Sequence, residues 1–142
     1  MNLAAQIPDG AWLLIDTIPL VCLLEGNELG APFEPLFADF DAGRLRAVVT
    51  PITLAEVACG PIKSGNEALA ARYAKLLTTG QGWSLRNIDA EIAISAARLR
   101  VRYRLKLPDA FQLAVALAEN CYALVTHDRD FGHVKDIAIL GC

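Results

Sequence analysis

Short apolar runs alternate with longer amphipathic segments along the chain, and this alternation gives the first indication of the fold. Apolar runs bounded by Gly, Pro or charged residues are typical of buried strands. Runs of this kind predict strands at 12–15, 47–49, 83–88, 122–126 and 137–140. The segments between them are long enough for helices, so strands and helices are expected to alternate.

The intervening segments carry helix start and stop signals. Thr50 followed by Pro51 is a favourable start, and Asp89 is another. The Gly60–Pro61 pair predicts the end of the helix that Pro51 opens. With Pro19 placed in the first turn of the first helix, we predict helices at 19–24, 35–42, 51–59, 67–77, 90–103 and 109–119.

Residues 98–107 fit two patterns. Basic and apolar side chains alternate strictly there, as they do in a strand. The preceding apolar residues are instead spaced as one face of a helix: Ile92, Ala96, Leu99 and Tyr103. We predict that the helix continues to about Tyr103.

Strands that alternate with helices predict an α/β protein whose parallel sheet is covered on both faces. The sequence shows no internal repeat and no low-complexity linker, and 142 residues suit one hydrophobic core. We therefore expect a single domain over 1–142. In such a sheet ligands bind beyond the carboxyl ends of the strands, so candidate chemistry is sought there.

Composition narrows the class of protein. Apolar residues make up 54% of the chain and charged residues 20%, which excludes a disordered chain. The formal net charge of −3 is unlike that of a purely electrostatic nucleic-acid binder. If the substrate is RNA, a local basic patch or a bridging metal must hold the phosphates. The N-terminus has no basic leader, and the apolar run 13–24 is interrupted and too short for a bilayer, so we expect a cytoplasmic protein without membrane contact.

The four cysteines are Cys22, Cys59, Cys121 and Cys142, and no two of them form a C-x-x-C pair. We expect reduced thiols, with Cys22, Cys59 and Cys121 in or near the core. The two histidines do not complete a cluster of zinc ligands, so a structural zinc site is disfavoured.

Four acidic residues occur in unusual settings. Asp16 and Asp128 follow predicted strands, whereas Glu56 and Asp109 lie on predicted helices. Each aspartate also has an ordinary structural interpretation, as a helix cap, a helix-dipole partner or a turn former. Glu56 shares the stripe of Ile52, Ala55 and Cys59, and a carboxylate on a buried stripe needs a partner.

If the two acids that follow strands and the two acids on helices form one site, they must meet at one end of the parallel sheet. Carboxylates so close together cannot all remain charged unaided, and a hard divalent cation such as Mg²⁺ or Mn²⁺ resolves the repulsion. Such ions activate water for attack on a phosphodiester. Motifs for phosphate-binding loops, dinucleotide folds and serine hydrolases are absent from the sequence, and an aspartyl-phosphate enzyme lacks its second acid after Asp16.

Four segments in order resemble PIN-domain proteins, and among them the VapC-type toxins of type II toxin–antitoxin systems. These segments are 14–17 (LIDT), 50–57 (TPITLAEV), 107–110 (LPDA) and 124–131 (LVTHDRDF). The resemblance implies a three-layer α/β/α sandwich with a central, mostly parallel twisted sheet. It also implies Mg²⁺- or Mn²⁺-dependent endoribonuclease activity, a cognate antitoxin and a homodimer.

The resemblance assigns roles to individual residues. It implies that the metal ligands and catalytic acids are Asp16, Glu56, Asp109 and Asp128. Thr126 matches a hydroxyl residue near the metal that orients a ligand or water. Asp130 matches a further acid that is either part of the site or a turn residue. Ile18 stands where the family often has Ser or Asn, which removes a polar neighbour of the metal ligands.

The densest positive run contains Arg98, Arg100, Arg102, Arg104 and Lys106. It is a solvated helix face, a track for the RNA backbone, or a docking surface for an acidic partner segment. Three functions remain open at this point. The leading one is an endoribonuclease toxin, and the alternatives are a housekeeping RNA-processing PIN nuclease and a PIN-like binding module without catalysis.

Overall fold

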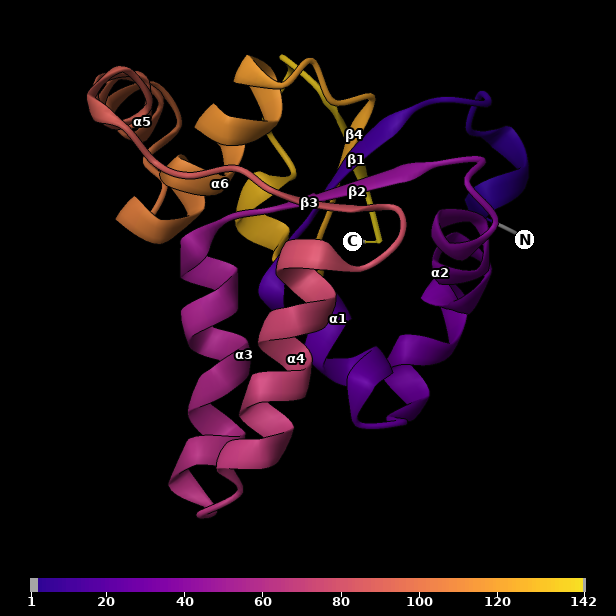
Figure 1. Ribbon diagram of the computed structural model, residues 1–142. Helices are drawn as coiled ribbons and strands as arrows, with labels where there is room; N and C mark the ends of the chain where they lie inside the picture. Colours follow the sequence, from indigo (N-terminus) through magenta and orange to yellow (C-terminus); the bar gives the residue numbers. More distant parts are fainter. Residues whose placement is uncertain (1–2, 142) are drawn as a thin grey trace.

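The computed structural model describes residues 3–141, and a five-stranded sheet forms its centre (Figure 1). All four strand pairings are parallel, and the strand order is β3-β2-β1-β4-β5. The strands are β1 (Trp12–Ile15), β2 (Arg46–Val49), β3 (Trp83–Leu85), β4 (Ala123–Val125) and β5 (Ala138–Leu140). The predicted parallel sheet is confirmed, and the first strand has the predicted bounds.

Among the described residues, six α-helices cover the two faces of this sheet, which confirms the predicted three-layer sandwich (Figure 1). They are α1 (Thr17–Leu24), α2 (Glu34–Asp41), α3 (Pro51–Lys63), α4 (Glu67–Thr79), α5 (Ala90–Tyr103) and α6 (Leu107–Ala118). Three short 3-10 helices add η1 (Leu3–Gln6), η2 (Glu28–Phe33) and η3 (Arg129–Phe131). In the described residues no helix is long and apolar enough to cross a membrane.

Successive strand residues point to opposite faces of the sheet and so divide the core in two. Leu13 and Ile15 of β1 pack with buried side chains of α1, α2, α3 and α4. Leu14, between them, packs with α5 and α6 on the other face. Because both faces are buried, the strands read as continuous apolar runs.

The helix starts follow the predicted caps. The Thr50 hydroxyl accepts a hydrogen bond from the Thr53 N–H, and the Asp89 carboxylate accepts one from the Ile92 N–H. The last predicted turn of α5 is also confirmed, because the helix ends at Tyr103 before Arg104, which has a left-handed backbone with φ of 55°. The basic alternation of 98–107 therefore belongs largely to a helix.

Two predictions about α3 are wrong. The helix passes through Gly60–Pro61 to Lys63, because the proline removes only one donor near its end. The closing hydrogen bond comes instead from the Asn66 N–H to the Pro61 carbonyl oxygen, after Gly65 has adopted a positive φ of 75°. Cys59 is exposed rather than in the core, whereas Cys22 and Cys121 are buried as predicted, and Cys142 lies outside the described residues.

Two glycines provide a matched test of packing at the end of the sheet. Gly43 and Gly82 have nearly equal positive φ values of 83° and 82°. A Cβ added to Gly43 would meet nothing within 4 Å, whereas one on Gly82 would lie 2.2 Å from the Phe40 carbonyl oxygen. We expect Gly43→Ala to cost about 1 kcal/mol through backbone strain. Gly82→Ala should cost at least about 1 kcal/mol more, because the backbone of α2 must move.

Urea unfolding of both variants measures this difference. Equal destabilisation of Gly43→Ala and Gly82→Ala would contradict the close approach of residue 82 to α2.

Candidate metal site at the carboxyl ends of the strands

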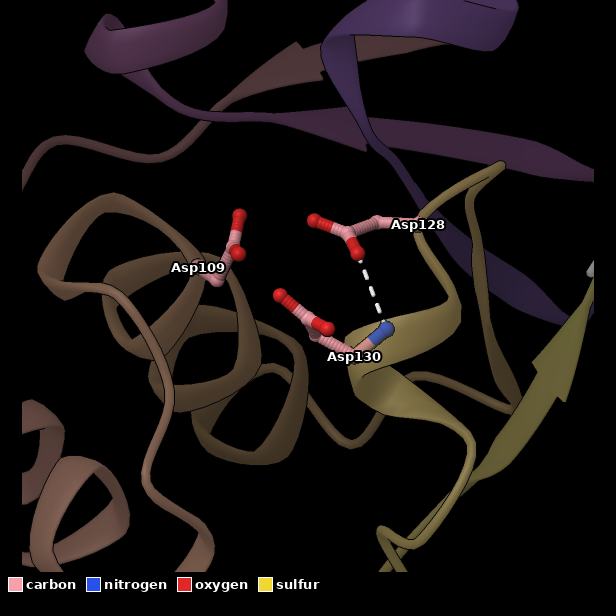
Figure 2. Close-up of side chains that lie close together, drawn as sticks. All are labelled: Asp109, Asp128 and Asp130. Carbon is pink, nitrogen blue, oxygen red and sulfur yellow. Dashed lines mark hydrogen bonds between the residues drawn. The ribbon is translucent and has the colours of Figure 1, made fainter.

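The candidate aspartates gather where the strands end, as the sequence predicts. Asp16 directly follows β1 and caps α1, and Asp128 follows β4 and caps η3. Asp109 lies in the first turn of α6. Figure 2 shows Asp109 reaching from α6 toward Asp128 and Asp130, which come from the η3 segment.

Three of these side chains form a compact cluster. One carboxylate oxygen from each of Asp109, Asp128 and Asp130 lies within 4.8 Å of the other two. The Asp130 N–H also donates a 2.9 Å hydrogen bond to Asp128 Oδ1, drawn as the dashed line in Figure 2. Asp130 thus forms part of the local turn, and its own carboxylate lies in the cluster.

Asp109 has the most perturbed environment of the three. Burial, the neighbouring Asp128 carboxylate and the charge of Asp16 raise the pKa of Asp109 to about 7, although Lys106 opposes the shift. Within residues 3–141 the buried Asp109 Oδ2 has no hydrogen-bond partner. Ionised Asp109 is therefore held close to other negative charge without a compensating donor at that oxygen.

Asp16 is held differently, because three donors fix its carboxylate. The Thr17 N–H donates to Oδ1 at 2.9 Å, the Gln112 amide donates to Oδ1 at 3.0 Å, and the Thr126 hydroxyl donates to Oδ2 at 2.8 Å. The Thr126 hydroxyl also accepts a 2.9 Å hydrogen bond from the Asp128 N–H. Thr126 therefore connects Asp16 to the turn that carries Asp128 and Asp130.

The structure corrects the predicted setting of Glu56. This residue is exposed, and the buried positions of α3 are Thr53 and Val57 rather than the stripe that contains Ile52. Partial desolvation of the carboxyl and the charge of Asp16 raise the pKa of Glu56, while a contact with the Thr17 hydroxyl lowers it. Glu56 is thus electrostatically coupled to Asp16, although it lies outside the three-aspartate cluster.

A network of buried polar side chains behind Asp16 was missed by the sequence analysis. It consists of Gln112 from α6, Thr53 from α3 and Thr50 at the start of α3. Gln112 gives a signal that was available in the sequence, because it is the single polar residue between Ala110 and Ala118. A lone amide in an apolar helix needs buried partners, and here Asp16 is one of them.

The basic run is exposed but does not form one stripe. Arg98 and Arg102, one helical turn apart, line a cavity of about 370 Å³ between α5 and α6. Arg100 lies two residues from each of them and so faces another direction, since each helical residue turns by about 100°. Arg102 also pairs with Asp136 at 3.7 Å. Lys106 is the member whose charge acts on Asp109.

Comparison with known proteins identifies the family of this chain. The family profile of the PIN domain matches residues 13–137. A chain of a toxin–antitoxin complex from Klebsiella pneumoniae is 27% identical, with a TM-score of 0.69 over 89% of this chain and 95% of that chain. Among curated proteins, none matches the sequence.

Two more distant structures share the fold at 17% identity and a TM-score of 0.67. VapBC2 from Rickettsia felis, bound to a DNA fragment from its promoter, matches over 90% of this chain and 96% of that chain. VapC20 from Mycobacterium tuberculosis, a toxin that cleaves the sarcin–ricin loop, matches over 84% of this chain and 92% of that chain. The resemblance inferred from the sequence is confirmed: the chain belongs to the PIN domain family, and its fold is that of VapC-type toxins.

Proposed function

We propose that this protein is a Mg²⁺- or Mn²⁺-dependent endoribonuclease and the toxin of a toxin–antitoxin pair. The observation that carries the proposal is the cluster of Asp109, Asp128 and Asp130 within 4.8 Å. Asp16 adjoins this cluster through Thr126 and through its charge on Asp109. Membership of the PIN domain family and the Klebsiella pneumoniae complex support a nuclease of this class.

The donor set suits a hard divalent cation. All its ligand atoms are carboxylate oxygens, which Mg²⁺ and Mn²⁺ prefer. The unpartnered buried Asp109 Oδ2 is the oxygen that most needs a positive neighbour. We infer that Asp16, Asp109, Asp128 and Asp130 all bind the ion. Glu56 would bind the ion from the edge of the site.

The chain's own residues would prepare the site for in-line hydrolysis of a phosphodiester. When bound, the cation supplies positive charge for the phosphate and an activated water. Thr126 holds the Asp16 carboxylate and the Asp128 backbone in fixed relation. Lys106 lies close enough to influence Asp109 and would contact an RNA phosphate, with Arg98, Arg100, Arg102 and Arg104 as outer contacts.

A cleavage assay on the purified chain tests this proposal directly. We expect RNA to be cut internally with Mn²⁺ or Mg²⁺ and to remain intact with chelator. A single-stranded DNA of the same sequence is the matched control and should remain uncut. RNA that is bound but never cut with either metal would contradict the proposal and favour the binding-module alternative.

The same site has features that suit an antitoxin. A cavity of about 300 Å³ between α1, α3 and α4 adjoins Glu56 and is lined mainly by apolar groups such as Val21 and Leu24. A partner segment lying there could extend a basic side chain to the nearby carboxylates. We infer an antitoxin of this kind and a homodimer of the toxin, which would cover part of the exposed apolar surface that includes Val101.

We predict that the antitoxin supplies an Arg or Lys that points at Asp16, Glu56 and Asp109 and competes with the metal. Co-expression of an antitoxin encoded in a small reading frame directly upstream should restore growth to cells that express this chain. A structure of the complex would show the basic side chain, and a partner bound far from these three acids would contradict the prediction. If expression alone leaves growth unaffected while the purified chain cuts RNA, the housekeeping alternative is favoured.

A further inference from the structure

Gln112 is a buried amide in an otherwise apolar part of α6. Its side chain is 1% exposed, and it is one of the largest fully buried side chains in the described part of the chain. The helix around it packs against β1 and β4 through apolar residues such as Leu113 and Ala114. An amide at such a position is costly unless all its polar atoms are bonded, so its partners indicate its role.

Every hydrogen-bonding group of this amide is used. Gln112 Oε1 accepts a 2.6 Å hydrogen bond from the Thr50 hydroxyl. Gln112 Nε2 donates to Thr53 Oγ1 at 2.7 Å and to Asp16 Oδ1 at 3.0 Å. A carboxylate only accepts hydrogen bonds, so Asp16 requires the NH₂ end of the amide to face it. The hydroxyl of Thr50, which donates to the other end, fixes the same orientation.

The position of Gln112 on α6 means that its hydrogen bond links Asp16 to the helix that carries Asp109. Gln112 follows Asp109 by three residues, so the two side chains project from neighbouring turns of one helix. The other donor to Asp16 Oδ1 is the N–H of the adjacent Thr17, which fixes Asp16 only relative to its own helix. Gln112 is therefore the donor that ties the Asp16 carboxylate to the helix carrying Asp109.

We propose that Gln112 is a positioning residue for the metal site: it holds the Asp16 carboxylate in place relative to Asp109 and thereby sets the affinity for a divalent cation. The inference rests on the proposed function, because it concerns the same site. Groups that orient metal ligands through hydrogen bonds change metal affinity about 10–100-fold when they are removed. A purely structural role would instead change the stability of the fold and leave cation affinity unaltered.

The test uses the purified full chain and Mn²⁺ alone, with binding measured by titration calorimetry and stability measured by urea unfolding in chelator. Gln112→Met keeps nearly the same length and volume but removes the donor to Asp16. We expect its dissociation constant for Mn²⁺ to rise about tenfold. Leu113→Ala is the matched control on the same helix, because it leaves a cavity in the core and retains the Gln112–Asp16 contact. We expect Leu113→Ala to be less stable than the unmodified protein but to bind Mn²⁺ with the same affinity.

The outcomes separate the two claims. If Gln112→Met binds Mn²⁺ as tightly as the unmodified protein, the positioning role is overturned. The same holds if Leu113→Ala loses as much Mn²⁺ affinity as Gln112→Met. Absence of Mn²⁺ binding by the unmodified protein overturns the proposed function, and the positioning role with it. Near-UV circular dichroism checks the fold of each variant, and Gln112→Leu replaces Gln112→Met if the latter does not fold.

Discussion

Asp109→Asn should reduce metal-dependent RNA cleavage by at least about 1,000-fold, which corresponds to about 4 kcal/mol of lost transition-state stabilisation. The substitution keeps the shape of the side chain and removes its charge. Asp109 carries a buried Oδ2 that has no hydrogen-bond partner among residues 3–141, and one of its carboxylate oxygens lies within 4.8 Å of oxygens of Asp128 and Asp130. Single-turnover cleavage at saturating Mn²⁺ measures the loss, and growth of expressing cells should recover in parallel.

The matched control for this loss is Asp41→Asn, which neutralises an exposed acid at the end of α2, outside the cluster. We expect this control to cleave at the unmodified rate. Circular dichroism must show that Asp109→Asn is folded. Unimpaired cleavage by folded Asp109→Asn would refute the assignment of Asp109 to the catalytic site.

The same substitution should raise the melting temperature of the metal-free protein at pH 8. The pKa of Asp109 is raised to about 7 in the folded chain, whereas an unfolded aspartate titrates near 4. The folded state therefore binds the proton more tightly, and its stability falls as the pH rises from about 4 through 7. Asn at this position cannot ionise, so its advantage over Asp109 should be larger at pH 8 than at pH 5.

Cation binding should offset the same repulsion. Mn²⁺ at a hundredfold excess over its dissociation constant stabilises a folded protein by about 2.7 kcal/mol, and Asp109→Asn should gain less than this. Thermal melting with chelator and with Mn²⁺, at both pH values, measures all these effects, with Asp41→Asn as the control. If Asp109→Asn melts below the unmodified protein in chelator at pH 8, Asp109 is a stabilising helix-start residue instead.

The sequence predicts the parts of the fold that depend on local pattern. β1 has the predicted bounds because both faces of the sheet are buried and its apolar run stops at Asp16. The start of α3 follows from Thr50 and Pro51, whose capping geometry involves only the next three residues. Asp16 and Asp128 lie at the same edge because β1 and β4 are parallel neighbours that end together.

The features that were missed depend on packing between distant segments. In the sequence, the stripe of α3 that contains Ile52 is as plausible a buried face as the one that contains Val57. The Val57 face is the buried one because it packs against α1 and α4. Gln112 bonds Thr50 and Asp16, which precede it by 62 and 96 residues. No local pattern specifies such distances, although a single amide in an apolar helix marks the position to inspect.

The order of the strands has a consequence for how the site opens. Asp16 follows β1, which is hydrogen-bonded to a strand on each side, whereas Asp128 and Asp130 follow β4, whose outer neighbour is the three-residue edge strand β5. Regions with fewer buried pairings open at lower free energy in local unfolding. Backbone amides of β1 should therefore exchange with deuterium far more slowly than those of β5 and the η3 turn. Transient opening of that edge would carry two carboxylates away from Asp109 while Asp16 stayed in place.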